Sequence, residues 1–355
     1  MPSLLDPILI GDLELPNRIL MAPLTRNRAT MPGRVPNALM KEYYRQRASA
    51  GAILTEATSV SPEGVGYPAT PGIWSEEQVA AWRDITDAVH AAGGRILMQL
   101  WHVGRISDPV YHEGRPPVAP SAIAPKGHVS LLRPIRDYSV PRALETAEVE
   151  AVVETFRRGA ENAKRAGFDG VEIHGANGYL LDQFLQDGTN KRTDRYGGPV
   201  ENRARLMLEV TDAVVSVWGS GRVGMHLAPR ADTHDMGDSD LPATFGYVAK
   251  ELGKRKIAFI MARESQAQPR LGPALKEAFG GTYIANEGLD PYVAEKLLAR
   301  GEADAVAFGK LFIANPDLVE RIRLAAPLNP WRKETFYEGG REGYVDYPAL
   351  AVAAE

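Results

Sequence analysis

The chain contains no cysteine among its 355 residues. Without thiols it cannot form disulfides, hold an iron–sulfur cluster, build a zinc site from cysteine ligands or use a thiolate nucleophile. Basic residues are not in excess either, because 41 Lys and Arg stand against 45 Asp and Glu and give a formal net charge of -4. Nucleic-acid surfaces normally show a concentrated excess of Lys and Arg, so this composition predicts no nucleic-acid partner.

Long apolar runs are missing as well. No stretch approaches the ~20 uncharged apolar residues that a membrane-spanning helix needs. The first residues, 1–7, lack a basic start followed by an apolar core, which argues against a secretory signal. We therefore expect a cytoplasmic protein with no membrane partner, and the 44% hydrophobic content is that of a globular chain with an ample core.

Short apolar segments alternate with stretches of helical periodicity along most of the chain. The eight segments with the composition of buried strands are 19–21, 52–54, 95–100, 171–173, 223–227, 257–260, 282–284 and 305–308. Eight β/α units predict a closed (β/α)8 TIM barrel of the α/β class, with residues 1–355 as a single domain. A doubly wound sheet is disfavoured because no Gly-x-Gly-x-x-Gly fingerprint follows the first strand.

Two segments depart from the alternation. Residues 8–15 read as a small hairpin that turns at Gly11-Asp12 and is suited to plug the bottom of a barrel. Residues 101–141 form a long insertion after the third strand, rich in Pro and Gly and without a helical pattern. Long loops in compact domains tend to be lids or binding loops, so we expect this insertion to wall the active site.

Polar residues follow the fourth strand in a distinctive order. His174, Asn177 and Tyr179 come directly after the apolar run 171–173, and catalytic groups of such barrels lie at the carboxyl ends of the strands. An imidazole, a carboxamide and a phenol at one mouth can bind a carbonyl oxygen and deliver a proton, which predicts an enzyme. The histidines at 90, 112, 128 and 234 show no metal-ligand spacing, so no metal site is predicted.

The ends of the last two strands suggest an anion site. Asn286-Glu287-Gly288 follows the seventh strand, Gly309-Lys310 follows the eighth, and a helix is expected to begin at Pro316-Asp317. Backbone N–H groups of a glycine turn, a lysine and a helix N-terminus attract a phosphate, and these two loops are its usual place in a TIM barrel. In the alternative interpretation, Lys310 is solvated and the glycines merely turn the chain.

Several long motifs, in order along the chain, carry a resemblance to a known family. They are 17–26, 99–105, 174–185, 192–198, 201–203, 307–317 and 343–347. With these motifs the chain resembles the old yellow enzyme family of FMN-dependent ene-reductases, a group that includes N-ethylmaleimide reductases and xenobiotic or nitroester reductases. The resemblance runs from near the N-terminus into the C-terminal tail.

The resemblance implies a non-covalently bound FMN lying across the barrel mouth. The residues that would contact it are Pro23, Leu24, Thr25, Ala57, Gln99, His226, Asn286, Glu287, Gly288, Gly309 and Lys310. Thr25 would donate to the flavin O4, Gln99 would bond the pyrimidine edge, and Lys310 would face the phosphate. Tyr67, Trp101 and Tyr344 would form aromatic walls of the substrate pocket, with the tail 326–355 closing over the site.

The resemblance also implies the reaction. NADPH or NADH would reduce the flavin, and an acceptor would then take the hydride in the same pocket, which gives ping-pong kinetics. Acceptors would be activated C=C bonds of enones, maleimides and nitroalkenes, with nitroesters or nitroaromatics as further substrates. His174 and Asn177 would hold the acceptor oxygen while Tyr179 protonates the α-carbon, in a monomer or homodimer that acts on small molecules.

Two positions depart from the family pattern. Many members carry arginine at the end of the fifth strand, facing flavin N1 and O2, where this chain has His226. Either His226 is protonated against the flavin or the nearby Arg230 takes part. Lys310 stands where arginine is frequent, which replaces a bidentate fork by a point charge.

Two other functions remain open at this point. The first is a cofactor-free TIM-barrel lyase or aldolase acting on a phosphorylated substrate, which would need a Schiff-base lysine or metal carboxylates at a strand end. Only Lys310 is available for that role. The second is a flavin-binding protein without useful turnover.

Overall fold

In the computed structural model, which describes residues 1–230 and 233–350, eight parallel strands close into a barrel. In spatial order they are β3 (Ile19–Met21), β4 (Ala52–Leu54), β6 (Ile96–Trp101), β9 (Gly170–His174), β10 (Val223–Leu227), β11 (Phe259–Arg263), β12 (Thr282–Asn286) and β13 (Ala305–Phe308). The pairings β4–β6 and β13–β3 complete the ring. The predicted TIM barrel is confirmed.

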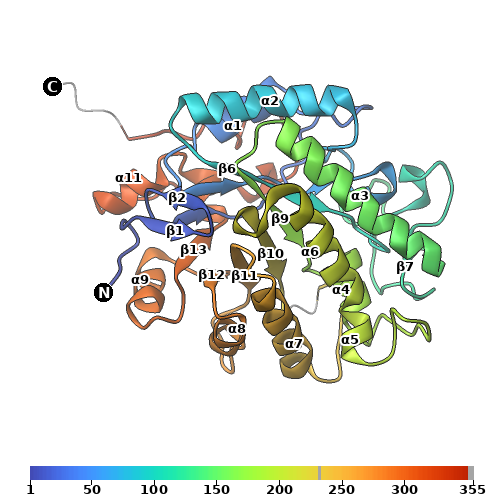
Figure 1. The fold of residues 1–355 in the computed structure, drawn as a ribbon. Helices are drawn as coiled ribbons and strands as arrows, with labels where there is room; N and C mark the ends of the chain where they lie inside the picture. Colours follow the sequence, from blue (N-terminus) through green and yellow to red (C-terminus); the bar gives the residue numbers. More distant parts are fainter. Residues whose placement is uncertain (231–232, 351–355) are drawn as a thin grey trace.

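Helices surround the barrel, as Figure 1 shows. The described helices are α1 (Ala38–Arg45), α2 (Glu76–Ala91), α3 (Thr146–Arg165), α4 (Leu180–Leu185), α5 (Val200–Arg203), α6 (Arg205–Trp218), α7 (Leu241–Lys254), α8 (Gly272–Phe279), α9 (Pro291–Ala299), α10 (Lys310–Ala314) and α11 (Leu318–Arg323). Their starts follow capping chemistry. At α2 the Ser75 hydroxyl accepts from the Gln78 N–H and the Gln78 side chain accepts from the Ser75 N–H, which satisfies two donors that the helix leaves open.

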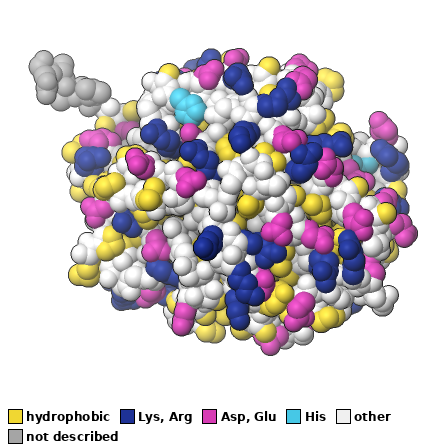
Figure 2. Space-filling view, in the orientation of Figure 1, with side chains coloured by type: hydrophobic (Ala, Val, Ile, Leu, Met, Phe, Trp, Pro, Cys, Tyr) yellow, Lys and Arg dark blue, Asp and Glu magenta, His cyan; other side chains and the backbone are white. Residues whose placement is uncertain are grey.

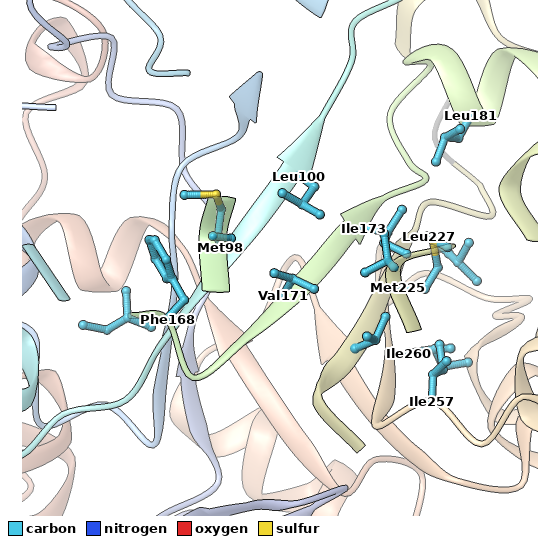
Figure 3. Close-up of a cluster of buried hydrophobic side chains, with 14 of the residues drawn as sticks. Met98, Leu100, Phe168, Val171, Ile173, Leu181, Met225, Leu227, Ile257 and Ile260 are labelled. Atoms are coloured by element: carbon cyan, nitrogen blue, oxygen red, sulfur yellow. The ribbon is translucent and has the colours of Figure 1, made fainter. Parts of the chain in front are cut away.

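Side chains along each strand point alternately outward and inward, so the barrel wall separates an outer apolar core from an inner one. Outward side chains such as Leu100, Ile173 and Met225 are fully buried against the helices (Figure 3). The intervening residues point into the barrel, where Leu97 and Met261 belong to a second cluster. This period of two places the polar residues Gln99, Glu172, His174 and His226 on the inner face.

The N-terminal hairpin is formed as predicted by β1 (Ile8–Ile10) and β2 (Leu13–Leu15). Its buried residues Ile10, Leu13 and Leu15 join the inner cluster, which closes the bottom of the barrel. Gly11 turns the hairpin with φ of +57°, and a Cβ there would meet the Gly221 carbonyl oxygen at 2.3 Å. Glycine is therefore required at this turn.

The sixth strand begins later than predicted. The sequence pattern indicated 257–260, whereas β11 runs over Phe259–Arg263. Lys256 has a left-handed φ of +53° and ends the preceding turn, and the inward alternation of Phe259 and Met261 then continues to Arg263. The shift places an arginine, rather than an aliphatic residue, at the carboxyl end of this strand.

The insertion 101–141 contains little regular structure, in agreement with the prediction. It holds a single 3-10 turn, Pro109–Tyr111, and the strand β7 (Val118–Ala119), which pairs with β8 (Arg142–Ala143) just beyond it. One more short strand, β5 (Thr58–Ser59), pairs with β6. The remaining 3-10 turns are Pro62–Gly64, Ser220–Arg222, Thr233–Asp235 and Lys333–Thr335.

Buried arginines hold the C-terminal tail against the barrel. Arg26 donates to the Gly343 carbonyl at 2.8 Å, and Arg28 donates to the carbonyls of Thr335 at 2.8 Å and Glu338 at 2.6 Å. Residues 351–355 of the tail predicted at 326–355 lie outside the described residues.

The visible surface carries charges of both signs, interspersed with apolar side chains over the face in Figure 2. Within residues 1–230 and 233–350, none of the helices combines the length and the apolarity needed to cross a membrane.

Candidate active site

The carboxyl ends of β6, β9 and β10 bring four polar side chains together, which are the predicted site residues Gln99, His174 and His226 and, in addition, Glu172. His174 and His226 are register partners, and their rings stack with centroids 5.4 Å apart. One layer below His174, Gln99 is paired in register with Glu172. All four side chains are buried, so the barrel mouth has a polar floor in an apolar surrounding.

Gln99 links Glu172 and His226 in this floor. Its Nε2 donates to Glu172 Oε2 at 2.7 Å and to His226 Nδ1 at 3.1 Å. Burial raises the pKa of Glu172 to about 8, and burial together with the charge of Arg263 lowers the pKa of His226 to about 3. Both groups are therefore neutral near pH 7. Glu172 Oε2 lies 3.8 Å from His226 Nδ1, but the two uncharged groups do not form a salt bridge.

A pH-dependent stability follows from Glu172. Its pKa is 4.5 in the unfolded chain and about 8 in the folded one, so the folded chain holds a proton that the unfolded chain has lost between these values. The contribution of Glu172 is complete below pH 4.5 and is lost as the pH rises through about 8. Between these pH values, Glu172→Gln should gain stability relative to the original chain by about 1 kcal/mol per pH unit. Urea unfolding of both FMN-free chains at a series of pH values measures this, and a pH-independent difference would contradict it.

His174 is held as a neutral donor. Its Nδ1 accepts from the Ala176 backbone N–H at 3.4 Å, which leaves the ring proton on Nε2. Burial, followed by the nearby His226 and Arg263, lowers the pKa of His174 well below its usual value. The imidazole therefore presents an N–H without carrying a full charge.

Tyr179 is the N-cap of α4 and lies beside His174. Its hydroxyl lies 2.7 Å from the hydroxyl of Tyr67, and its ring packs edge-on against the rings of Trp101 and His174 with centroids 5.0 Å apart in both cases. Burial raises the pKa of Tyr179, whereas the hydrogen bond with Tyr67 lowers it. Tyr179 is thus a protonated phenol at neutral pH, with a second phenol placed to support loss of its proton.

A cavity of about 440 Å³ opens above these residues. It is lined by Thr25, Tyr67, His128, Ser130, Leu131, Arg133, Tyr179, His234 and Tyr337. Four of these residues belong to the insertion 101–141, and Tyr337 comes from the tail.

The predicted aromatic walls are distributed differently around this cavity. Tyr67 lines it, whereas Trp101 is fully buried and stacks behind Tyr67 with ring centroids 5.4 Å apart. The structure does not bring Tyr344 to the cavity. Tyr344 is fully buried and stacks on Tyr43 at 4.1 Å, because Arg26 and Arg28 pack over its ring under the tail. Tyr337 is the tail residue that faces the cavity.

Residues of the first two strand-end loops lie around the same mouth. Thr25 reaches the cavity, with Pro23 and Leu24 just before it and half-buried. Ala57 is buried in an apolar cluster with Tyr67 and Trp101.

The predicted anion site is only partly free. Asn286 donates through Nδ2 to the Ala307 carbonyl at 2.8 Å, and the Glu287 carboxylate is paired with Arg263. Gly288 has φ of +67°, and a Cβ on Gly309 would approach Leu24 Cδ2 at 3.1 Å. Lys310 is exposed, with Nζ 5.7 Å from the Trp331 ring centroid. The helix expected at Pro316-Asp317 is α11, which has Asp317 as its N-cap, and the additional short helix α10 begins at Lys310 itself.

The floor fits a flavin. Because Gln99 donates to Nδ1 of His226, the ring proton lies on Nε2, and this buried N–H has no acceptor among the described residues. A buried donor without a partner is costly unless a ligand supplies an acceptor. The pyrimidine edge of a flavin carries such acceptors, so Gln99 and His226 would hold it.

Neither source of charge expected near the flavin is found there. His226 is neutral, and Arg230 donates to the carbonyls of Ala267 and Pro269 and lies 3.6 Å from Glu264. The guanidinium that acts on the pKa of both His174 and His226 belongs to Arg263. Sequence reasoning missed this residue because it ended the sixth strand at Ile260. Following the inward alternation from Phe259 through Met261 would have found it.

Comparison with protein families decides the identity. The model of the NADH:flavin oxidoreductase / NADH oxidase family matches residues 3–329. The chain belongs to this family. It is therefore an NAD(P)H:flavin oxidoreductase of the old yellow enzyme type, and the cofactor-free lyase alternative is excluded. FMN is the flavin that membership implies.

Relatives cover nearly the whole length of the chain. 12-Oxophytodienoate reductase 1 of Oryza sativa subsp. japonica is 44% identical over 363 residues, which is 98% of this chain and 93% of the relative. The solved old yellow enzyme homologue from Zymomonas mobilis superposes with a TM-score of 0.96 at 45% identity, covering 98% of this chain and 100% of that one. Morphinone reductase in complex with tetrahydroNAD gives a TM-score of 0.94 at 47% identity, covering 99% and 98%.

Proposed function

We propose that this old yellow enzyme homologue reduces activated C=C bonds, with nitroesters or nitroaromatics as further acceptors. FMN, when bound, supplies the hydride after NADPH or NADH has reduced it. The observation that carries the proposal is the pair of neutral donors at the barrel mouth, the His174 N–H and the Tyr179 O–H, whose rings pack against each other while Tyr179 lines the cavity.

His174 would bind the carbonyl or nitro oxygen of the acceptor through Nε2. Negative charge grows on that oxygen as hydride reaches the β-carbon, so a fixed donor stabilises the transition state more than the ground state. Asn177, three residues along the same loop, would supply a second donor through its amino group. The burial of His174 strengthens this interaction because water does not screen it.

Tyr179 would deliver a proton to the α-carbon. Tyr67 would donate its hydroxyl hydrogen to the Tyr179 oxygen, which leaves the Tyr179 hydrogen free to face the substrate. This direction agrees with the effect of the pair on each pKa, since the bond lowers the pKa of Tyr179 and raises that of Tyr67. Hydride and proton together saturate the double bond.

Stopped-flow spectroscopy of the two half-reactions tests the proposal. NADPH should bleach the flavin of the FMN-loaded chain, and 2-cyclohexenone should restore its colour with formation of cyclohexanone. A nitroester and a nitroalkene in parallel would rank the acceptor classes. A flavin that is bleached but recovers with none of these acceptors would contradict the proposal and favour a flavin carrier without useful turnover.

Lys310 would act as the counter-charge of the FMN phosphate. Lys310→Met should weaken FMN binding about 10-fold, the size expected for one charge-assisted contact. The loss should shrink at high salt, because screening weakens the contact. Lys296→Met is a matched control, since Lys296 is exposed and lies over an aromatic ring, Tyr292, at 4.0 Å. FMN titration by fluorescence quenching measures both, and equal affinities would favour the solvated interpretation of Lys310.

A further inference from the structure

We propose that Arg263 is a positioning residue that fixes the orientation of the Asn177 carboxamide, so that its amino group faces the acceptor. This inference rests on the proposed function, in which Asn177 binds the acceptor oxygen. The inference is based on a contact between Arg263, at the end of β11, and Asn177, in the loop after β9.

Arg263 contacts two loops at the barrel mouth. Its Nη1 donates to Asn177 Oδ1 at 2.9 Å, and its Nη2 donates to Glu287 Oε1 at 3.0 Å. The arginine side chain is about one-third exposed, with a relative accessibility of 32%. The guanidinium therefore bridges the loop after β9 and the loop after β12.

The chemistry of the guanidinium determines which way the carboxamide faces. Arginine carries five N–H donors and no acceptor, so only the oxygen of Asn177 can face it. The amino group must then point away from Arg263, and among the described residues no hydrogen bond engages it. A carboxamide without such a partner could present either its oxygen or its amino group to the substrate, and an oxygen there would repel the acceptor.

The backbone of Asn177 is held independently of Arg263. Its carbonyl lies 2.7 Å from His234 Nδ1, and its φ of +59° is a left-handed conformation that asparagine tolerates. The following Gly178 N–H donates to Asp182 Oδ2 at 2.8 Å. With the main chain held by these contacts, the freedom that remains at Asn177 is rotation of its side chain, which Arg263 restrains.

Arg263 is itself well placed for this role. It is the last residue of β11 and is in register with Asn286 of β12. Glu287, which follows Asn286, supplies the carboxylate that binds the Nη2 atom of Arg263. The strand end fixes the backbone of Arg263, and Glu287 holds its otherwise flexible side chain.

The test compares Arg263→Met, Arg263→Lys and Asn177→Ala in the FMN-loaded enzyme. Met removes every donor. Lys keeps a positive charge and N–H donors without an acceptor, so it too can bind only the oxygen of the carboxamide. Arg263→Met should weaken phenol binding and slow flavin reoxidation by 2-cyclohexenone about 10-fold each, and Arg263→Lys should restore most of both. In the Asn177→Ala background, Arg263→Met should have no further effect, because the group it orients is gone.

Controls separate orientation from folding and from charge. Arg255→Met, which removes an ion-paired guanidinium from the end of α7, should change neither readout. FMN affinity and thermal midpoint report whether Arg263→Met folds and loads normally. Additive effects in the double variant, or failure of Arg263→Lys to recover binding, would overturn the inference. If the original enzyme does not reduce the enone at all, the proposed function fails, but the coupling of the two residues in phenol binding can still be measured.

Discussion

Tyr179→Phe is expected to slow reoxidation of the reduced enzyme by 2-cyclohexenone at least ~10²-fold, the lower range for general acid catalysis. Reduction of the flavin by NADPH should remain nearly unchanged, because hydride transfer from a nicotinamide needs no proton from this phenol. The ring of Tyr179 packs against Trp101 and His174, and Phe keeps that packing. Single-turnover measurement of the two half-reactions separates the steps.

Tyr67→Phe provides the matched comparison. It removes the neighbouring hydroxyl, 2.7 Å away, but leaves the proton of Tyr179 in place. Without the donor from Tyr67 the pKa of Tyr179 should rise further, so the same half-reaction should slow by about 10-fold, less than in Tyr179→Phe. Equal slowing of both half-reactions in Tyr179→Phe, or a larger effect from Tyr67→Phe, would refute the assignment of the proton donor.

His174→Ala is the second substitution with a large expected effect. Removing a donor aimed at a developing oxyanion costs about 10²- to 10³-fold in rate, and we expect a loss of this size with enone acceptors. Phenol binding over the flavin should weaken as well, since it uses the same donor. Absorbance titration with a phenol and stopped-flow reoxidation measure the two effects on one sample.

His174→Gln distinguishes the donor from the charge. A glutamine can present an N–H from the same strand position, and His174 is neutral because burial lowers its pKa. Glutamine should therefore recover part of the lost rate, and reoxidation in the original enzyme should not titrate with His174 between about pH 6 and 8. A loss of rate as the pH rises through about 6.5 would show that a protonated imidazole is needed instead.

Much of the fold followed from local pattern. Eight apolar segments with helices between them predicted the barrel, and the turn at Gly11-Asp12 predicted the hairpin that closes its bottom. Such features depend on periodicity and turn chemistry, which are local. The order of polar residues after the fourth strand also predicted that His174 and Tyr179 would lie together at the barrel mouth, because the carboxyl ends of parallel strands converge there. In the structure their rings pack against each other, and Tyr179 lines the cavity.

The remaining site features depend on contacts distant in sequence. Arg263 reaches Asn177 across 86 residues, and its importance appears only once β11 is known to extend beyond Ile260. In the tail, Tyr337 and Tyr344 are seven positions apart and both aromatic, yet only Tyr337 meets the cavity because buried arginines enclose Tyr344. Sequence pattern alone does not distinguish a wall residue from an anchor.

The departure at His226 acquires a physical meaning in the structure. The Gln99 carboxamide donates to both the neutral His226 imidazole and the neutral Glu172 carboxyl. The floor therefore offers an uncharged donor at the position where the family resemblance implies arginine. The positive charge that acts on the pKa of His226 comes from Arg263 on the adjacent strand, which is paired with Glu287.

The most direct test of the account is flavin binding by the isolated chain. After incubation with FMN and removal of the excess by gel filtration, the protein should be yellow and carry one FMN per chain, released on denaturation because no covalent bond holds it. His226→Phe, which removes the unpartnered N–H from the floor, should lower this affinity. A chain that stays colourless after incubation, while its circular dichroism shows it folded, would contradict the account.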